Sequence, residues 1–195
     1  MIIGITGGTG CGKTTLLHVL ADQGFTVLDC DQIYHDLLQT DKALLSTINE
    51  HFPGTVLQGV LERKKLGQIV FNDPAALQTL NAITHKAVKA EVMQRLESVH
   101  RPVAIDAIGL FEGGLAEICD MTIAVTAPES TRISRLMRRD NIPETYARIR
   151  SAAQRSQKEF ESLCDHTLCN DSTEAAFREK CLAFLQGLGI IKVSK

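Results

Sequence analysis

GGTGCGKTT, at residues 7–15, matches the phosphate-loop pattern G-x-x-x-x-G-K-[ST] at every fixed position. The apolar run at residues 1–6 is typical of a buried strand, and residues 15–21 have the apolar content of a helix that packs on a sheet. A strand, a glycine turn and a helix aim backbone N–H groups and the positive end of a helix dipole at a polyphosphate. The sequence therefore predicts a nucleoside triphosphate site.

The residues of this loop have separate tasks in such a site. Lys13 can reach the β- and γ-phosphates, and the hydroxyl of Thr14 can contact Mg²⁺, so we expect a divalent cation with ATP. Cys11 lies near a helix N-terminus and Lys13, a setting that lowers the pKa of a thiol. We expect it to be alkylated or oxidised unless ATP protects it; the alternative is a small residue standing where serine would serve. The expected ATP-binding residues are Gly8, Thr9, Gly10, Cys11, Gly12, Lys13, Thr14 and Thr15.

The composition is that of a globular protein with 195 residues, 44% of them hydrophobic and 23% charged. A formal net charge of -2 gives no electrostatic case for nucleic acid or an anionic membrane as the main partner, and no obligatory protein partner is evident. The N-terminus enters a strand without a signal-peptide pattern. Six cysteines include no C-x-x-C pair, which favours free thiols over a zinc site or disulfides. We expect a cytoplasmic protein.

Strand patterns alternate with helix patterns along the chain. Further strands are expected at residues 25–28, 102–106, 121–126 and 167–169. Helices are expected at residues 33–38, 43–52, 74–100, 128–139, 143–157 and 174–185. This alternation predicts an α/β fold whose parallel sheet is covered on both faces. The mostly helical stretch between the second and third strands is long for a crossover, so we expect it to form a lobe beside the sheet.

Carboxylates follow two of these strands, at the edge where open α/β sheets bind ligands. Asp31 is the candidate proton acceptor, since its strand is expected beside the phosphate-loop strand, where it can contact an acceptor hydroxyl. Asp29 is an alternative for that role or for orienting metal-bound water, and either residue can instead be a helix cap. Asp106 ends an apolar strand as a Walker-B-type acid does. It is expected to hold Mg²⁺ or its water shell, or to bond Thr14.

Basic side chains gather in two places. For Arg132 and Arg135, in the helix at residues 128–139, we expect a solvated surface with i,i+4 partners. The run from Arg63 to Lys65 is either surface or a contact for an anionic substrate. Nothing in the local pattern distinguishes the helical histidines at positions 35 and 85.

Together these residues resemble the dephospho-CoA kinase family, and the match runs through most of the chain. Residues 29–35, DCDQIYH, are similar to its D-A-D-x-x-x-H, behind a loop similar to its G-G-x-G-x-G-K-[ST]. Further similarities follow in order: residues 61–71 to L-x-R-x-x-L-G…V-F, 80–85 to L-N-x-I-x-H, 106–112 to D-x-P-L-L-F-E, 150–154 to R-x-x-x-Q and 164–170 to A-D-x-x-x-x-N. The ordered downstream motifs make the resemblance far more specific than the phosphate loop alone.

The resemblance implies ATP-dependent phosphorylation of the ribose 3′-hydroxyl of dephospho-CoA, the last step of coenzyme A synthesis. Asp31 matches the second Asp of D-A-D and is the implied base, with Lys13 and Arg139 the other catalytic residues. Arg139 matches the lid arginine that binds ATP phosphates and the transition state, and Asn170 is implied near the adenine. The expected acceptor-binding residues are Asp31, His35, Arg63, His85 and Asp106.

The implied architecture is a three-layer P-loop kinase fold with a five-stranded parallel sheet, a helical acceptor-binding lobe and a helical lid. The expected segments are a core at about 1–31, 101–131 and 163–195, a lobe at about 32–100 and a lid at about 132–162.

The chain departs from the family pattern near the expected acceptor site. Ile108-Gly109-Leu110 stands where the family has Pro-Leu-Leu, and Lys86 stands where it has proline. One alternative is therefore a P-loop kinase for another small hydroxyl acceptor, such as a nucleoside, a nucleotide or a shikimate-like alcohol. Another is a nucleotide-dependent switch, against which the chain has no guanine-specifying N-K-x-D.

Overall fold

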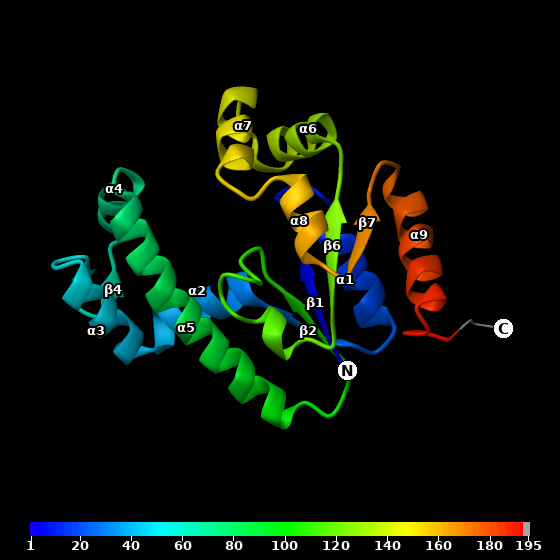
Figure 1. Cartoon of the computed structure of the whole chain (residues 1–195). Coiled ribbons are helices and arrows are strands. Elements are labelled where there is room, and N and C mark those ends of the chain that lie inside the picture. Colours follow the sequence, from blue (N-terminus) through cyan, green and yellow to red (C-terminus); the bar gives the residue numbers. More distant parts are fainter. Residues whose placement is uncertain (193–195) are drawn as a thin grey trace.

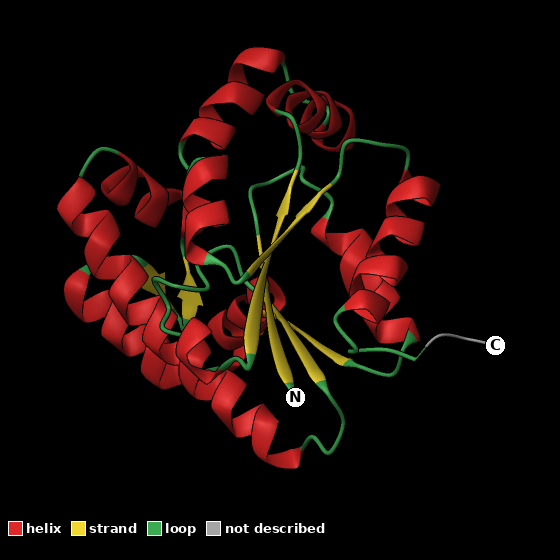
Figure 2. Cartoon of the chain, turned by 45° about the vertical axis from the view of Figure 1, so that its right-hand side comes forward, coloured by secondary structure: helices red, strands yellow, loops and turns green. Residues whose placement is uncertain are grey.

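The computed structural model describes residues 1–192, in which a five-stranded parallel sheet lies between layers of helices (Figures 1 and 2). The strand order is β2 (Thr26–Asp29), β5 (Val103–Asp106), β1 (Ile2–Thr6), β6 (Met121–Thr126) and β7 (His166–Cys169). The expected five-stranded parallel sheet is thus confirmed. The expectation that β2 lies beside β1 is wrong, because β5 returns from the helical excursion of residues 30–98 into the position between them.

Both faces of the sheet are buried, which explains why its strands are nearly continuous apolar runs. Ile3 and Ile5 of β1 belong to the core on one face, with α1 (Lys13–Asp22) and α9 (Glu174–Gly187). Ile105 of β5 belongs to the core on the other face. The carboxyl ends of the parallel strands consequently meet at one edge, where the phosphate loop and Asp106 emerge.

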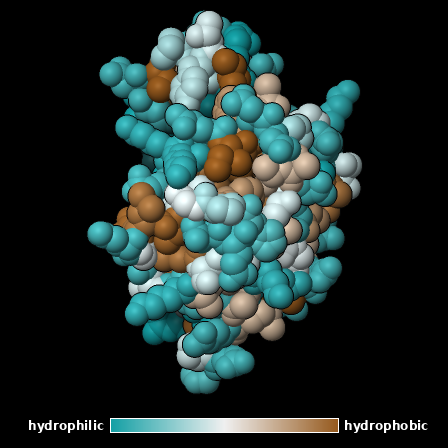
Figure 3. Space-filling model, turned by 90° about the vertical axis from the view of Figure 1, so that its left-hand side faces the viewer, coloured by the Kyte–Doolittle hydropathy of each residue, from teal (hydrophilic) through white to brown (hydrophobic). Residues whose placement is uncertain are grey.

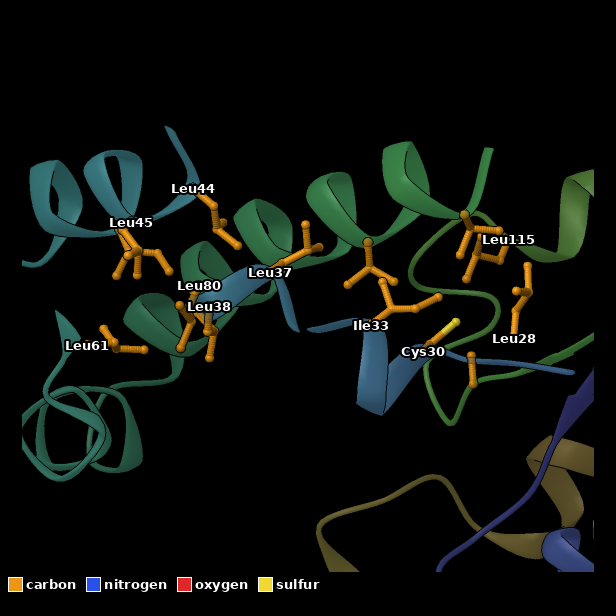
Figure 4. Packing of buried hydrophobic residues seen from close by; sticks show 14 of the residues in the cluster. Leu28, Cys30, Ile33, Leu37, Leu38, Leu44, Leu45, Leu61, Leu80 and Leu115 are labelled. Atoms are coloured by element: carbon orange, nitrogen blue, oxygen red, sulfur yellow. The ribbon is translucent and has the colours of Figure 1, made fainter. Parts of the chain in front are cut away.

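A helical lobe, residues 30–98, lies to the side of the sheet (Figure 1). It contains α2 (Cys30–Thr40), α3 (Lys42–His51), α4 (Arg63–Phe71) and α5 (Pro74–Ser98). Asp side chains at the N-caps of α2, α3 and α5 accept hydrogen bonds from backbone amides of the first turn. Leucines and isoleucines from α2, α3 and α5 share one apolar layer (Figure 4). Leu28 of β2 and Ile105 of β5 belong to the same buried cluster, so the sheet and the lobe share one continuous core.

A short hairpin inside the lobe was not expected from the sequence. It pairs β3 (Val56–Leu57) with β4 (Val60–Leu61) through Gln58-Gly59, both at positive φ. Two residues at positive φ make the type I′ turn that suits a two-residue hairpin. Each strand has only two residues, too few to show an alternating pattern.

Helices α6 (Glu129–Asp140) and α7 (Glu144–Ala152) lie over the carboxyl end of the sheet, and α8 (Gln157–Leu163) lies beside β6 (Figure 1). The expected single helix over residues 143–157 is wrong. The chain breaks after Ala152, and Ser156 starts α8 with a capping box to Glu159. A short 3₁₀ helix, η1 (Ala116–Ile118), lies between β5 and β6.

The surface of the lobe side shows separate apolar patches among hydrophilic side chains (Figure 3). Exposed apolar residues of the lobe include Leu57, Val60, Ile69, Phe71 and Leu77. Over residues 1–192, no helix combines the length and apolar character that crossing a membrane requires.

Candidate active site

A cavity of about 870 Å³ lies at the carboxyl end of the sheet. β1 is the middle strand, and its two neighbours β5 and β6 come from later parts of the chain, which places the phosphate loop where ligands bind in such sheets. The loop from Gly8 to Thr15 lines the cavity. Asp29, Asp31, Asp106, Arg139 and Asn170 line it as well. Site residues that the sequence predicted from separate motifs, far apart along the chain, thus line one cavity.

The phosphate loop is shaped by contacts that leave no room for larger residues. Gly12, at φ 96°, immediately precedes α1, and a Cβ there would lie 2.1 Å from Nδ2 of Asn170. Lys13 donates a hydrogen bond from Nζ to the carbonyl of Gly7 at 2.9 Å. The lysine is therefore held over the loop, beside the free amides of the first turn of α1.

Asn170, expected near the adenine, also fixes the loop. Its Nδ2 donates to the carbonyl of Cys11 at 2.9 Å, and its Oδ1 accepts from Nη2 of Arg135 at 3.1 Å. Arg135 in turn donates from Nη1 to the carbonyl of Gly10 at 3.3 Å. The expectation of a solvated surface role for Arg135 is wrong, because it lines the cavity and bonds the loop.

Arg132 was expected on the solvated face of its helix, and this too is wrong. The residue is 7% exposed, with Nε donating to the carbonyl of Thr9 at 3.1 Å and Nη2 to Oγ of Ser151 at 2.8 Å. The amide of Thr9 donates to Oε1 of Gln154 at 2.7 Å. Both backbone groups of one loop residue are thus held by side chains from the α6–α7 region.

The charge of Arg132 has no carboxylate partner within salt-bridge distance among the described residues. Its guanidinium instead lies behind the loop, where a Cβ on Gly8 would be 2.6 Å from Nη2. A buried cation in this position adds to the positive potential felt by an anion in the cavity.

Asp106 is the acid that ends β5. Burial raises its pKa to about 6, with Lys13 opposing the shift and Asp29 and Asp31 adding to it. Its Oδ1 is buried and has no hydrogen-bond partner among the described residues. An oxygen left in this state fits a ligand of Mg²⁺ or of its water shell, since Mg²⁺ binds oxygen and keeps several waters.

The two candidate bases have different local roles. Asp29 is the N-cap of α2, and its Oδ1 accepts from the amide of Gln32 at 3.0 Å. Asp31 lies in the first turn of α2, rather than at the end of a strand beside β1, and makes no side-chain hydrogen bond with a described residue. The carboxylate of Asp29 is therefore engaged in capping α2, whereas the carboxylate of Asp31 can contact a substrate.

A second cavity, of about 220 Å³, adjoins the first. Asp31 and Ile108 line both cavities. His85 lines the second, and its Nε2 lies 3.4 Å from the Cβ position of Gly109. A side chain at position 109 would narrow this space, so one of the departures from the family pattern borders the second cavity.

His35 and Arg63 lie together but outside this second cavity. Nη2 of Arg63 is 3.2 Å from Nδ1 of His35. Lys86, the other departure from the family pattern, is exposed on α5. Of the expected acceptor-binding residues, the second cavity thus unites Asp31 with His85.

Arg139 lies at the end of α6 and lines the first cavity. It donates to both oxygens of Asp140, from Nε at 2.7 Å and Nη2 at 3.0 Å. These hydrogen bonds, with a further one from Arg150, hold the pKa of Asp140 at about 2. The carboxylate is therefore charged at neutral pH and fixes two arginines near the cavity.

The expectation that Cys11 has a lowered pKa is wrong. The side chain is 1% exposed, and burial raises the pKa of its thiol despite the opposing charge of Lys13. Because the thiol is buried away from solvent, we interpret Cys11 as a small packing residue rather than a reactive thiol.

Comparison with known proteins identifies the family of this chain. The family model for dephospho-CoA kinase matches residues 1–176. A dephospho-CoA kinase of Lactobacillus acidophilus is 33% identical over 178 residues, covering 88% of this chain and 89% of the relative. One of Moorella thermoacetica is 38% identical over 160 residues, covering 78% and 76%.

Solved structures show the same relation. A Thermus thermophilus protein has a TM-score of 0.83 at 30% identity, covering 96% of this chain and 97% of its own. A dephospho-CoA kinase from Campylobacter jejuni has a TM-score of 0.69 at 26% identity, covering 96% of both chains. A shikimate kinase from Acinetobacter baumannii, at 16% identity and a TM-score of 0.52, covers 96% of this chain and 92% of its own and shares the fold alone. The chain belongs to the dephospho-CoA kinase family and is an ATP-dependent kinase.

Proposed function

We propose that the protein transfers the γ-phosphoryl group of ATP to the ribose 3′-hydroxyl of dephospho-CoA. The observation that carries this proposal is the position of Asp31 in the wall shared by the two cavities. One cavity has the phosphate loop and the other has none, so a donor and an acceptor can meet at this carboxylate. Relatives named as dephospho-CoA kinases supply the identity of the acceptor.

On the donor side, the loop amides and Lys13 bind the ATP phosphates, and Asn170 keeps the loop in shape. Thr14 and Asp106 would hold Mg²⁺, Asp106 directly or through water, and the ion supplies charge neutralisation on the phosphates. Arg139, at the edge of the cavity, stabilises the charge of the transferring phosphoryl group when the α6–α7 pair acts as a lid.

On the acceptor side, Asp31 accepts the proton of the 3′-hydroxyl as the oxygen attacks. Its carboxylate is exposed to the cavity and unpaired by described side chains, as a base must be before substrate binds. His85 and the loop around Gly109 enclose the acceptor next to it. The absence of a side chain at position 109 leaves this enclosure open enough for a nucleoside.

The test is ADP release from ATP and Mg²⁺, with and without dephospho-CoA. Dephospho-CoA is expected to stimulate turnover. Asp31→Asn should reduce the stimulated kcat by about a hundredfold to ten-thousandfold while ATP affinity stays unchanged, because only the base is lost. Asp36→Asn is the matched control, since Asp36 lies on the same helix and lines neither cavity.

Two results would overturn the proposal in different ways. Stimulation by another hydroxyl acceptor, but not by dephospho-CoA, would favour the kinase of a different small alcohol. A stimulated rate that survives Asp31→Asn would show that Asp31 is not the catalytic base.

The cellular location is a separate part of the proposal. The six cysteines are all free, which supports a reducing cytoplasm as the site of action.

A further inference from the structure

The connector between α7 and α8, residues 153–156, contacts two different loops through two consecutive side chains. Oε1 of Gln154 accepts a hydrogen bond from the amide of Thr9, in the phosphate loop, at 2.7 Å. Nε of Arg155 donates to Oε1 of Glu112, in the loop that follows β5, at 2.6 Å. One short segment thus holds two loops that are far apart in the sequence.

The loop that follows β5, residues 107–115, forms one wall of the second cavity, and we call it the acceptor loop. Gly109 and Gly113 are among its residues that line the cavity, and the amide of Gly113 donates to the carbonyl of Gly109 at 2.9 Å. Oε2 of Glu112 lies 3.9 Å from the Cβ position of Gly109. The ion pair with Arg155 therefore fixes a carboxylate directly behind this wall.

The same ion pair balances a negative charge beside the site of an anionic acceptor. If Arg155 were lost, the carboxylate of Glu112 would lack the partner that directs it and would oppose the approach of a diphosphate. Neither side chain is among the described residues that line the two cavities. Arg155 and Glu112 consequently act on an acceptor through the loop, as positioning residues.

Gln154, the neighbour of Arg155, lies on the donor side. It lines the first cavity, and its partner amide belongs to the loop that binds the ATP phosphates. A nucleotide that contacts the loop amides therefore acts on the hydrogen bond between Thr9 and Gln154. Adjacent Cα atoms are about 3.8 Å apart, so a shift of Gln154 also moves Arg155.

Resting on the proposed function, we propose that Arg155 and Glu112 couple the binding of the two substrates. ATP at the phosphate loop acts through Gln154 and this ion pair to position the acceptor loop for dephospho-CoA. Because such coupling is reciprocal, each substrate raises the affinity for the other by the same factor. The two side chains are 33% and 39% exposed, and a pair exposed to this extent supports a factor of about two to five.

The experiment measures the dissociation constant of dephospho-CoA by calorimetry, with and without Mg²⁺ and the non-hydrolysable analogue β,γ-methylene-ATP. In the wild type, the analogue is expected to lower this constant by about two- to fivefold. Arg155→Met should abolish that factor and leave the dissociation constant of the analogue alone unchanged. Arg155→Lys, which keeps the charge but not the guanidinium, should retain part of the factor.

Two further variants make the test specific. Glu112→Gln removes the charge at the other end of the pair, and the double variant Glu112→Gln/Arg155→Met should lose no more coupling than either single variant. Arg148→Met is the matched control. Arg148 lies on α7 and also pairs with glutamates, but it is not among the described residues that line the cavities. It should leave the factor unchanged.

ADP release stimulated by dephospho-CoA is measured in parallel, which separates this inference from the proposed function. If the wild type does not phosphorylate dephospho-CoA, both are overturned. If it does so but the analogue leaves the dissociation constant of dephospho-CoA unchanged, only the coupling is overturned. A factor that survives in Arg155→Met and Glu112→Gln, or that falls equally in Arg148→Met, would show that the ion pair does not carry the coupling.

Discussion

Replacing Arg132 with methionine should both destabilise the protein and weaken ATP binding. The guanidinium is almost completely buried and donates hydrogen bonds to the carbonyl of Thr9 and the hydroxyl of Ser151. Methionine fills much of the same space but donates nothing. The carbonyl of Thr9 then stays buried without this donor, and the phosphate loop keeps only its hydrogen bonds with Arg135 and Gln154 in the α6–α7 region.

The magnitude follows from these two contacts. A hydrogen bond from a charged donor contributes about 1.5–3 kcal/mol, and part of the loss is offset because a buried charge is no longer desolvated. We therefore expect Arg132→Met to lower the free energy of unfolding by about 3 kcal/mol. For a chain of this length, that change corresponds to a fall in Tm of about 6–12 °C.

Thermal and urea unfolding of the ligand-free protein measure the stability, and ATP titration measures the affinity. Arg138→Met is the control for stability alone, because Arg138 lines the first cavity but is exposed on the same helix and has no hydrogen bond or ion pair with another described residue. It should change stability by no more than about 0.5 kcal/mol. If Arg132→Met were as stable as this control and bound ATP as tightly as the unmodified protein, the role derived for Arg132 would be refuted.

Two further predictions concern titratable groups of the site. Carboxyl NMR of the ligand-free protein should give Asp106 a pKa of about 6, and Lys13→Met should raise it further because Lys13 lowers it. Because the pKa of Asp106 is higher in the native than in the unfolded protein, its contribution to the free energy of unfolding is full at acidic pH and is lost as pH rises through about 6. An ordinary pKa for Asp106, or a lower pKa in Lys13→Met, would contradict the prediction. Cys11 should react slowly with iodoacetamide in the native protein, with or without ATP, and rapidly in urea, because it is buried and its pKa is raised. Mass spectrometry of labelled peptides measures this, and equal rates in native protein and urea would show that the burial argument is wrong.

The features that local sequence patterns predicted are those with local causes. The phosphate loop, the apolar strands and the helix that starts at Asp73-Pro74 each follow from a short stretch of residues. Strand order has no such signal, since the position of β5 depends on where the chain returns after the lobe. The hairpin of β3 and β4 was too short to produce a pattern.

The site residues divide in a similar way. Asp29 and Asp31 both follow a strand and differ only in which carboxylate turns back to cap α2. Arg132 has the spacing of a solvated helical face, and only the segment from Ser151 to Gln154, folded against it, makes it a buried residue. Cys11, whose neighbours in sequence had suggested a reactive thiol, is buried in the core that β1 shares with α1 and α9. In each case a contact distant in sequence decides a role that neighbouring residues leave open.

The hydrogen bonds that hold the phosphate loop also have a consequence for biosynthesis. The loop leaves the ribosome before its hydrogen-bond partners, because Arg132, Gln154 and Asn170 follow it by 123, 145 and 159 residues. β1 likewise has no strand neighbour until β5 has been made. The nucleotide site is therefore completed only after these later segments have been made. A nascent chain released before Asn170 emerges lacks a shaped loop, so a truncated product of this gene should not compete with the finished enzyme for ATP.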